Sequence, residues 1–149
     1  MPLNFGLEYV AEDGSRKRPI MIHRVCYGSI ERFIGIITEH FAGKFPLWLA
    51  PLQVKVLPVS DKSMDYAKTV YEQLRGAKIR TELDTRNEKI GYKIREARQV
   101  DRVPYMLIIG EKEVESGTVS VRDRDTDQTT TMTMDELIAM LGKKIADRV

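Results

Sequence analysis

Hydrophobic positions follow three strand-like patterns in the second half of the chain. Residues 52–59 form a β-branched run, which predicts a buried strand. Apolar and polar residues alternate over residues 79–83, which predicts a second strand. Residues 105–109 form a continuous apolar run that ends at Gly110, as is typical of a central parallel strand.

Helical spacing fills the intervals between these strands. Ser60 and Asp61 can cap a helix whose apolar face runs from Met64 to Leu74, and Gly76 stands where a C-cap glycine belongs. Residues 87–102 predict a second helix, with its apolar residues inward and its lysines and arginines outward. Strands that alternate with helices predict an α/β fold with a mixed, mostly parallel sheet flanked by helices.

The last third of the sequence adds three features to this sheet. Residues 118–122 alternate and predict an antiparallel strand, with Ser120 and Arg122 on one face. A polar loop or hairpin follows at 123–128, and residues 129–131 fit either an edge strand or a loop. Thr133 and Glu136 match a capping box ahead of a final helix.

The first 48 residues have a different organisation. A turn signal at residues 12–15 separates two extended pieces, the second of which is predicted at 18–26. A helix from Ser29 to Phe41 follows, and prolines bracket a stiff connector at residues 46–51. A hairpin and a helix with no packing partner in their own sequence indicate a piece of something larger.

Composition restricts the possible functions. The net charge is +2, from 24 basic and 22 acidic residues, so any contact with RNA must come from a local cluster of charge. The single cysteine, Cys26, excludes an internal disulfide and is expected in the core. No apolar run reaches a membrane span and the N-terminus lacks a signal pattern, so we expect a cytoplasmic protein without membrane contact.

The residues by themselves identify no enzyme. Metal-binding motifs such as C-x-x-C and H-E-x-x-H are absent, and so is a glycine-rich phosphate loop, which disfavours a nucleotide-binding enzyme. The segment 86–102 is basic and contains Tyr92, so it could meet a phosphate backbone and stack a base. From composition alone, the favoured interpretation is instead a solvated helix whose lysines and glutamates support each other. Gly91 within this helix suggests the close approach of another backbone.

Several longer segments resemble one family. Residues 18–24 and 28–33 are similar to the third signature motif of class II aminoacyl-tRNA synthetases in its threonyl form. The chain is similar to the same family over residues 43–51, 84–96, 103–107 and 111–122. The resemblance implies a remnant of the catalytic domain at 1–48 and an anticodon-binding domain at 49–149.

The resemblance also implies roles for two residues of the first part. Arg32 matches the arginine that meets the ATP phosphates, and His23 matches one ligand of a catalytic zinc ion. The other two zinc ligands lie outside these residues. We therefore expect no cofactor bound to this chain, whereas the full-length enzyme would use zinc, ATP and magnesium.

Four further residues match positions that the family uses against the tRNA anticodon, namely Asn87, Arg102, Glu113 and Arg122. Threonine anticodons share guanine and uracil at their second and third letters. The expected partner is therefore the anticodon stem-loop of threonine tRNA, and the full-length protein is expected to be a homodimer.

The resemblance leaves the enzyme question open. The full-length protein would be a threonine–tRNA ligase, but this chain lacks most of the catalytic site and should not form an adenylate alone. An alternative is a free-standing synthetase paralogue with a regulatory or subunit-assembly role. The native start of the reading frame would separate the two hypotheses.

Overall fold

The computed structural model describes all residues from 1 to 149, and they form two compact units, Met1–Ile36 and Ile37–Val149. The first unit contains β1 (Tyr9–Val10) and β2 (Arg16–Lys17), and α1 (Ile30–His40) begins in it and continues into the second. The division at residue 48 that the resemblance implies stays a prediction. None of the helices combines the length and the apolar character that crossing a bilayer requires.

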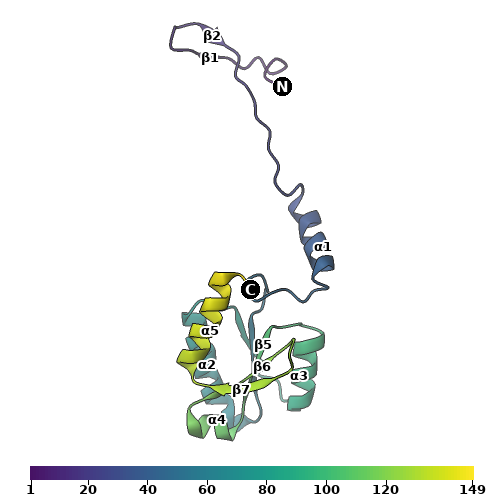
Figure 1. Ribbon diagram of the computed structural model, residues 1–149, viewed down its shortest axis with the longest axis vertical. Helices are drawn as coiled ribbons and strands as arrows, with labels where there is room; N and C mark the ends of the chain where they lie inside the picture. The colour runs from purple at the N-terminus through teal and green to yellow at the C-terminus, as the bar shows by residue number, and fades with distance from the viewer. The chain divides into compact units, whose positions relative to one another are not determined.

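The second unit holds the remaining strands and helices (Figure 1). Its strands are β3 (Val54–Pro58), β4 (Thr81–Leu83), β5 (Tyr105–Ile109), β6 (Val119–Asp123) and β7 (Thr129–Met132). Its helices are η1 (Asp61–Ser63), α2 (Met64–Gly76), α3 (Ile90–Gln99), α4 (Glu111–Ser116) and α5 (Met134–Asp147).

The five strands form one sheet in the order β4-β3-β5-β6-β7. β3 pairs in parallel with β4 and β5, whereas β6 pairs antiparallel with β5 and β7. Both β3 and β5 are almost entirely buried, because helices cover both sides of the parallel part of the sheet. The mixed α/β sheet flanked by helices that the sequence predicts is confirmed, with two parallel and two antiparallel pairings, and residues 129–131 belong to an edge strand.

Two layers of apolar side chains hold the sheet between its helices. Figure 1 shows α2 and α5 on one side of the sheet and α3 on the other. The larger core lies under α2 and α5, and it includes Val54, Val56, Leu107, Leu74 and Leu137. The smaller core joins α3 to the opposite side of the sheet through Leu57, Ala97 and Met106.

The connector before the sheet is anchored by side chains of the second unit. Leu47 is buried in the larger core, and its carbonyl accepts a 2.9 Å hydrogen bond from Gln53 Nε2. Arg80 Nε donates to the carbonyl of Ala50 at 2.9 Å. These bonds hold the proline-bracketed segment against the sheet.

Of three predictions for the first unit, one is confirmed and two are wrong. The turn at 12–15 is confirmed, since Tyr9 pairs with Lys17 across it. The strand predicted at 18–26 is wrong: no strand lies beside these residues to take its backbone hydrogen bonds. Cys26 is exposed, contrary to the prediction of a core position, because none of residues 1–36 is buried.

The helices of the second unit also require corrections. Gly76 is the last residue of α2, and the left-handed residue that follows the helix is Lys78, with φ of 61°. α3 is shorter than predicted, ending at Gln99. No atom of another segment lies within 4 Å of a Cβ built on Gly91, so no second backbone approaches it. Lys93 points inward rather than outward and is only 3% exposed.

Candidate nucleic-acid interface

One face of the sheet is only half covered by helices. Residues that pair directly across strands share a face, so Arg122 lies with Met106 and Thr129, and Ser120 lies with Ile108 and Thr131. α3 packs on this face only over β3 and β5, through Leu57 and Met106. We call the remaining part, formed by Ser120, Arg122, Thr129 and Thr131, the open half-face. Its polar side chains are partly or fully exposed.

Glu113 is fixed at one border of the open half-face. It is the third residue of α4, where its Oε2 accepts a 2.9 Å hydrogen bond from the backbone N–H of Gly110. Its Oε1 accepts a 2.7 Å bond from Ser120 Oγ, which joins α4 to β6. Burial alone would raise the pKa of Glu113, but the bonds from Ser120 and Gly110 outweigh it and lower the pKa below its ordinary value. Glu113 is therefore an oriented carboxylate at neutral pH.

Arg122 lies two residues beyond Ser120 on the same face of β6, about 7 Å along the strand. Its guanidinium contacts Asp127 in the β6–β7 turn, with an Nη2–Oδ1 distance of 2.7 Å. Asp127 also pairs with Arg98 of α3 at 3.0 Å, so one carboxylate bridges Arg122 on the open half-face and Arg98 on the neighbouring helix. These ion pairs lower the pKa of Asp127, the hydrogen bond from Arg122 being the main cause.

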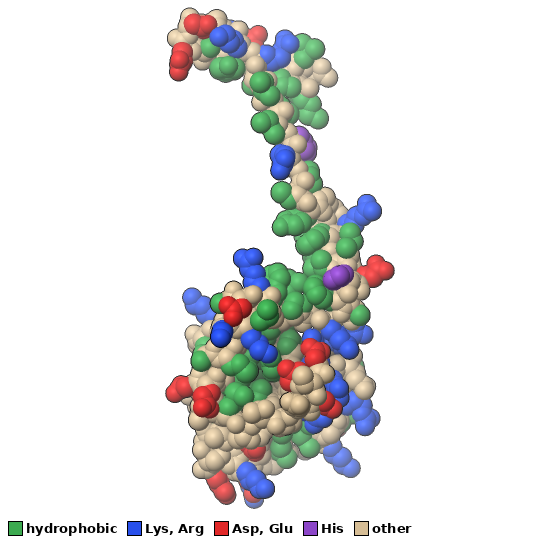
Figure 2. Space-filling view, viewed as in Figure 1, with side chains coloured by type: hydrophobic (Ala, Val, Ile, Leu, Met, Phe, Trp, Pro, Cys, Tyr) green, Lys and Arg blue, Asp and Glu red, His purple; other side chains and the backbone are tan.

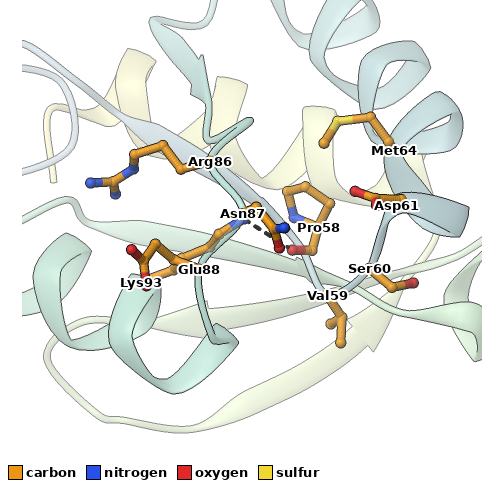
Figure 3. Close-up of a pocket in the computed structure, with 9 residues that line it drawn as sticks. All are labelled: Pro58, Val59, Ser60, Asp61, Met64, Arg86, Asn87, Glu88 and Lys93. Atoms are coloured by element: carbon orange, nitrogen blue, oxygen red, sulfur yellow. Dashed lines mark hydrogen bonds between the residues drawn. The ribbon is translucent and has the colours of Figure 1, made fainter.

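Asn87 lies in the loop between β4 and α3 and is exposed. It lines a pocket of about 250 Å³ beyond the carboxyl end of β3. Figure 3 shows its side chain beside Pro58 and Lys93, with Asp61 and Met64 across the pocket. Asn87 therefore belongs to a separate hollow at the carboxyl edge of the sheet.

Arg102 lies on the other side of α3, before the amino end of β5. Its backbone is left-handed, with φ of 54°, and its guanidinium donates to the carbonyl of Ala42. Together with Lys44 and Arg98 it borders a hollow of about 310 Å³. The structure thus places Arg102 with Arg98 and apart from Asn87 and Glu113.

Arg32 and His23 both lie in the first unit and are exposed. Arg32 is on α1, where its backbone N–H donates to Ser29 Oγ at 3.2 Å. No three histidine, cysteine, aspartate or glutamate side chains come together in an arrangement that could hold a metal ion. His23 alone is fewer than the three protein ligands of a catalytic zinc ion, so these residues do not form a zinc site by themselves.

Sequence reasoning missed a buried charged network beside Asn87. Asp84, with its side chain 1% exposed, contacts Arg86 at 2.6 Å and lies 3.9 Å from Lys93. Arg86 also pairs with Glu96. The hydrogen bond from Arg86 is the main reason why the pKa of Asp84 is lowered. Lys93 follows Ile90 by three residues and precedes Ala97 by four, and this spacing could have placed it on the inward face.

The sequence is similar to proteins of a known family. A family model described as the anticodon binding domain matches residues 53–144. The threonine–tRNA ligase of Caldanaerobacter subterraneus subsp. tengcongensis is 59% identical over 148 residues, which are 99% of this chain and 23% of that protein. The corresponding ligase of Clostridioides difficile is 57% identical with the same coverage. The chain thus spans about a quarter of the length of these relatives.

Two solved structures have a similar fold. The RNA binding domain of threonyl-tRNA synthetase from Cryptosporidium parvum superposes with a TM-score of 0.78 at 38% identity, covering 95% of this chain and 36% of that one. Prolyl-tRNA synthetase from the same organism has a TM-score of 0.76 at 21% identity, covering 98% of this chain and 31% of that one, which shows a shared fold. The chain belongs to the anticodon binding domain family, and its sequence groups it with the threonyl-tRNA synthetases.

Proposed function

We propose that this chain recognises the anticodon of threonine tRNA through the open half-face and its borders, together with Asn87 at the carboxyl edge of the sheet. The observation that carries the proposal is the Glu113 carboxylate held by Ser120 Oγ at 2.7 Å, on the strand face where Arg122 lies two residues further along β6. An acceptor and a forked donor at a set spacing can read the edge of an unpaired base.

The chemistry of these side chains suits the guanine and uracil that threonine anticodons share. Arg122 can donate to the O6 and N7 acceptors of guanine, and Glu113 can accept from its ring and amino N–H groups. The amide of Asn87 can both donate and accept, as the edge of uracil requires. Ser120 holds Glu113 in one orientation before RNA arrives, which reduces the entropy cost of binding.

Basic side chains beside the open half-face would contact the RNA backbone. Arg98 and Arg102 lie on or just after α3, and Lys44 borders the same hollow. With a net charge of only +2, the chain must concentrate its positive charge locally to attract an anticodon loop. In this proposal these cations position the RNA, and the side chains of the open half-face read its bases.

The activity proposed for the full-length protein is ATP-dependent ligation of threonine to tRNA, by a cytoplasmic homodimer. In that protein, which would use magnesium with ATP, Arg32 would meet the ATP phosphates, because its guanidinium carries a permanent positive charge and is exposed. His23 would contribute one zinc ligand, with the others supplied by residues outside this chain. The chain alone is proposed to bind RNA without forming an adenylate.

Titration of the chain with fluorescently labelled threonine anticodon stem-loops tests the proposal. We expect a loop with its second and third anticodon bases exchanged to bind roughly 10-fold or more weakly, since one bidentate base contact contributes about 1–3 kcal/mol. Arg122→Ala and Glu113→Gln should each reduce this discrimination. Measurement at two salt concentrations separates base contacts from phosphate contacts.

Arg75→Ala is the matched control. Arg75 is exposed on α2, the helix that covers the opposite face of the sheet, and its removal costs the same formal charge as Arg122→Ala. It should leave unchanged the ratio of the affinities for the native and the exchanged loop. Equal binding of the native and exchanged loops by the unmodified chain, fading with salt, would contradict the proposal.

A further inference from the structure

A buried arginine in the β6–β7 turn joins three segments of the second unit. The side chain of Arg124 is only 6% exposed and borders the hollow of about 310 Å³. Its Nη1 donates to the carbonyl of Arg102 at 2.8 Å and to that of Phe45 at 3.2 Å. Its Nε and Nη2 donate to the two carboxylate oxygens of Asp125, each at 2.9 Å. Arg124 therefore links the segment before the connector, the loop between α3 and β5, and the β6–β7 turn.

The donors of Arg124 are used almost entirely inside the protein. A guanidinium group has five N–H donors, and these four hydrogen bonds occupy four of them. Arg102 is exposed and Arg98 is partly exposed, whereas the burial of Arg124 leaves it almost no surface that RNA could contact. An effect of Arg124 on RNA binding would therefore have to act through the groups that it holds.

Arg124 bonds to the loop between α3 and β5 on both sides of a buried residue. Its guanidinium donates to the Arg102 carbonyl, and its backbone N–H donates to the carbonyl of Pro104 at 2.9 Å. Val103 between them is fully buried. Arg102 has a φ of 54°, which a residue with a side chain rarely adopts unless its surroundings hold it there. Arg124 thus helps to set the direction in which the Arg102 side chain leaves the loop.

The same arginine fixes the β6–β7 turn. Asp125, which it holds, also donates its backbone N–H to Asp123 Oδ1 at 2.7 Å. Two residues later Asp127 pairs with Arg98 of α3 at 3.0 Å. The end of α3 is therefore tied to the turn at two points, through Asp127 and through Arg124. A phosphate that took the place of Asp127 beside Arg98 would break the first tie and leave the second intact.

We propose that Arg124 is a positioning residue for RNA binding, which fixes Arg102 relative to Arg122 of the open half-face without touching the RNA. The inference rests on the proposed function, in which basic side chains position the RNA backbone while the open half-face reads the bases. Groups that are already held at a set spacing lose less conformational entropy when RNA binds.

A double-mutant cycle with the threonine anticodon stem-loop tests this role. Arg124→Met keeps most of the side-chain volume but removes every donor, and it should weaken binding about 10-fold. Arg102→Ala should weaken binding by about 5- to 10-fold in the unmodified chain. In the Arg124→Met background it should have less than about a 2-fold effect, because a cation that is no longer held in place contributes little. A merely structural role of Arg124 would leave the two effects multiplicative.

Arg80→Met is the matched control. Arg80 also donates to two backbone carbonyls of the connector, those of Ala50 and Trp48, each at 2.9 Å. It lies directly before β4, however, at the opposite edge of the sheet from β7. Arg80→Met should leave the affinity for the stem-loop and the effect of Arg102→Ala unchanged.

Thermal unfolding checks that each variant is folded. If Arg124→Met does not fold, Arg124→Lys gives the same cycle. Lysine keeps the charge but lacks the planar fork that reaches all three segments, so the effect of Arg102→Ala should again be reduced.

The two proposals fail in different ways. If the unmodified chain binds the native and the exchanged anticodon loop equally, the proposed function fails. If it distinguishes them, and Arg102→Ala weakens binding as much in the folded Arg124 variant as in the unmodified chain, only the positioning role of Arg124 is overturned.

Discussion

Asp84 is the acceptor on which the buried charges beside the pocket depend. It follows β4 directly, is almost fully buried, and accepts from Arg86 Nε at 3.0 Å and from Arg86 Nη2 at 2.6 Å. Lys93 lies beside it with no other carboxylate in contact. Removing one partner of a buried ion pair is costly because the other charge stays buried without compensation.

Asp84→Asn should therefore reduce the free energy of unfolding by about 3 kcal/mol at pH 7. The folded-state pKa of Asp84 is lowered, chiefly by Arg86, so its contribution is present above its unfolded pKa of 3.8 and is lost as the pH falls through the folded pKa. The unmodified chain should lose stability below about pH 4, and the variant should lose less over the same range. Urea unfolding at a series of pH values measures both.

Asp65→Asn is the control for this prediction, since the Asp65 side chain is 96% exposed and pairs only with Lys68 at the surface. It should change stability by less than about 0.5 kcal/mol. Parallel pH profiles for Asp84→Asn and the unmodified chain would show that Asp84 does not carry the acid sensitivity.

For single residues, the sequence predicts side-chain positions only in part. The alternation of β6 placed Ser120 and Arg122 on one face, as the structure shows. Sequence placed Lys93 outward because charge usually marks a solvated helix face, yet Asp84, nine residues earlier, allows it to be buried. The bridge from Asp127 to Arg98 and Arg122 depends on a turn meeting a helix, which no local pattern contains.

At the scale of elements, α5 begins with a reciprocal cap. The backbone N–H and the hydroxyl of Thr133 both donate to Glu136 Oε2 at 2.9 Å, and Thr133 Oγ accepts from the Glu136 backbone N–H at 3.4 Å. α5 contributes Leu137 and Leu141 to the larger core. The cap therefore stabilises a helix that covers part of one face of the sheet.

Thr133→Ala should lower the free energy of unfolding by about 1 kcal/mol, because the first turn of α5 loses its side-chain acceptor. Urea unfolding followed by circular dichroism measures the difference. Thr130→Ala, at an exposed site of β7, is the control and should have less than half this effect. Equal effects of the two substitutions would show that the cap contributes nothing specific.

Elements with a long, clear period were predicted well and short ones were not. β5 spans Tyr105–Ile109 as its apolar run indicated, and the capping box places the start of α5 correctly. No hydrophobic pattern predicted α4, because its six residues contain only one large apolar side chain, Val114. α3 ends before Arg102 because Arg102 adopts a left-handed backbone, a choice that the continuing charge pattern did not reveal.

At the scale of the whole molecule, all tightly packed residues lie in the second unit. The buried hydrophobic residues run from Leu47 to Leu141, and residues 1–36 include no buried position. The first unit instead exposes many large apolar side chains, among them Ile20, Ile22 and Phe5, and Figure 2 shows hydrophobic surface along it. The stability of the chain should therefore reside in residues 37–149.

A chain starting at residue 37 should unfold cooperatively with the same urea midpoint as residues 1–149, within experimental error. It should also aggregate less, because the exposed apolar residues of the first unit are removed. Urea unfolding and light scattering provide the comparison. A large fall in the midpoint would mean that residues 1–36 stabilise the second unit.

The Asp127 carboxylate between Arg98 and Arg122 has a consequence for selectivity among RNAs. In the free protein it already occupies both guanidinium groups, much as a phosphate would. A polyanion that binds to these two arginines must replace the Asp127 carboxylate. The net electrostatic free energy of binding is therefore small. Under the proposed function, a ligand that offers base edges as well as phosphates gains more from the exchange, so Asp127 should favour the anticodon loop over RNAs that offer phosphates alone.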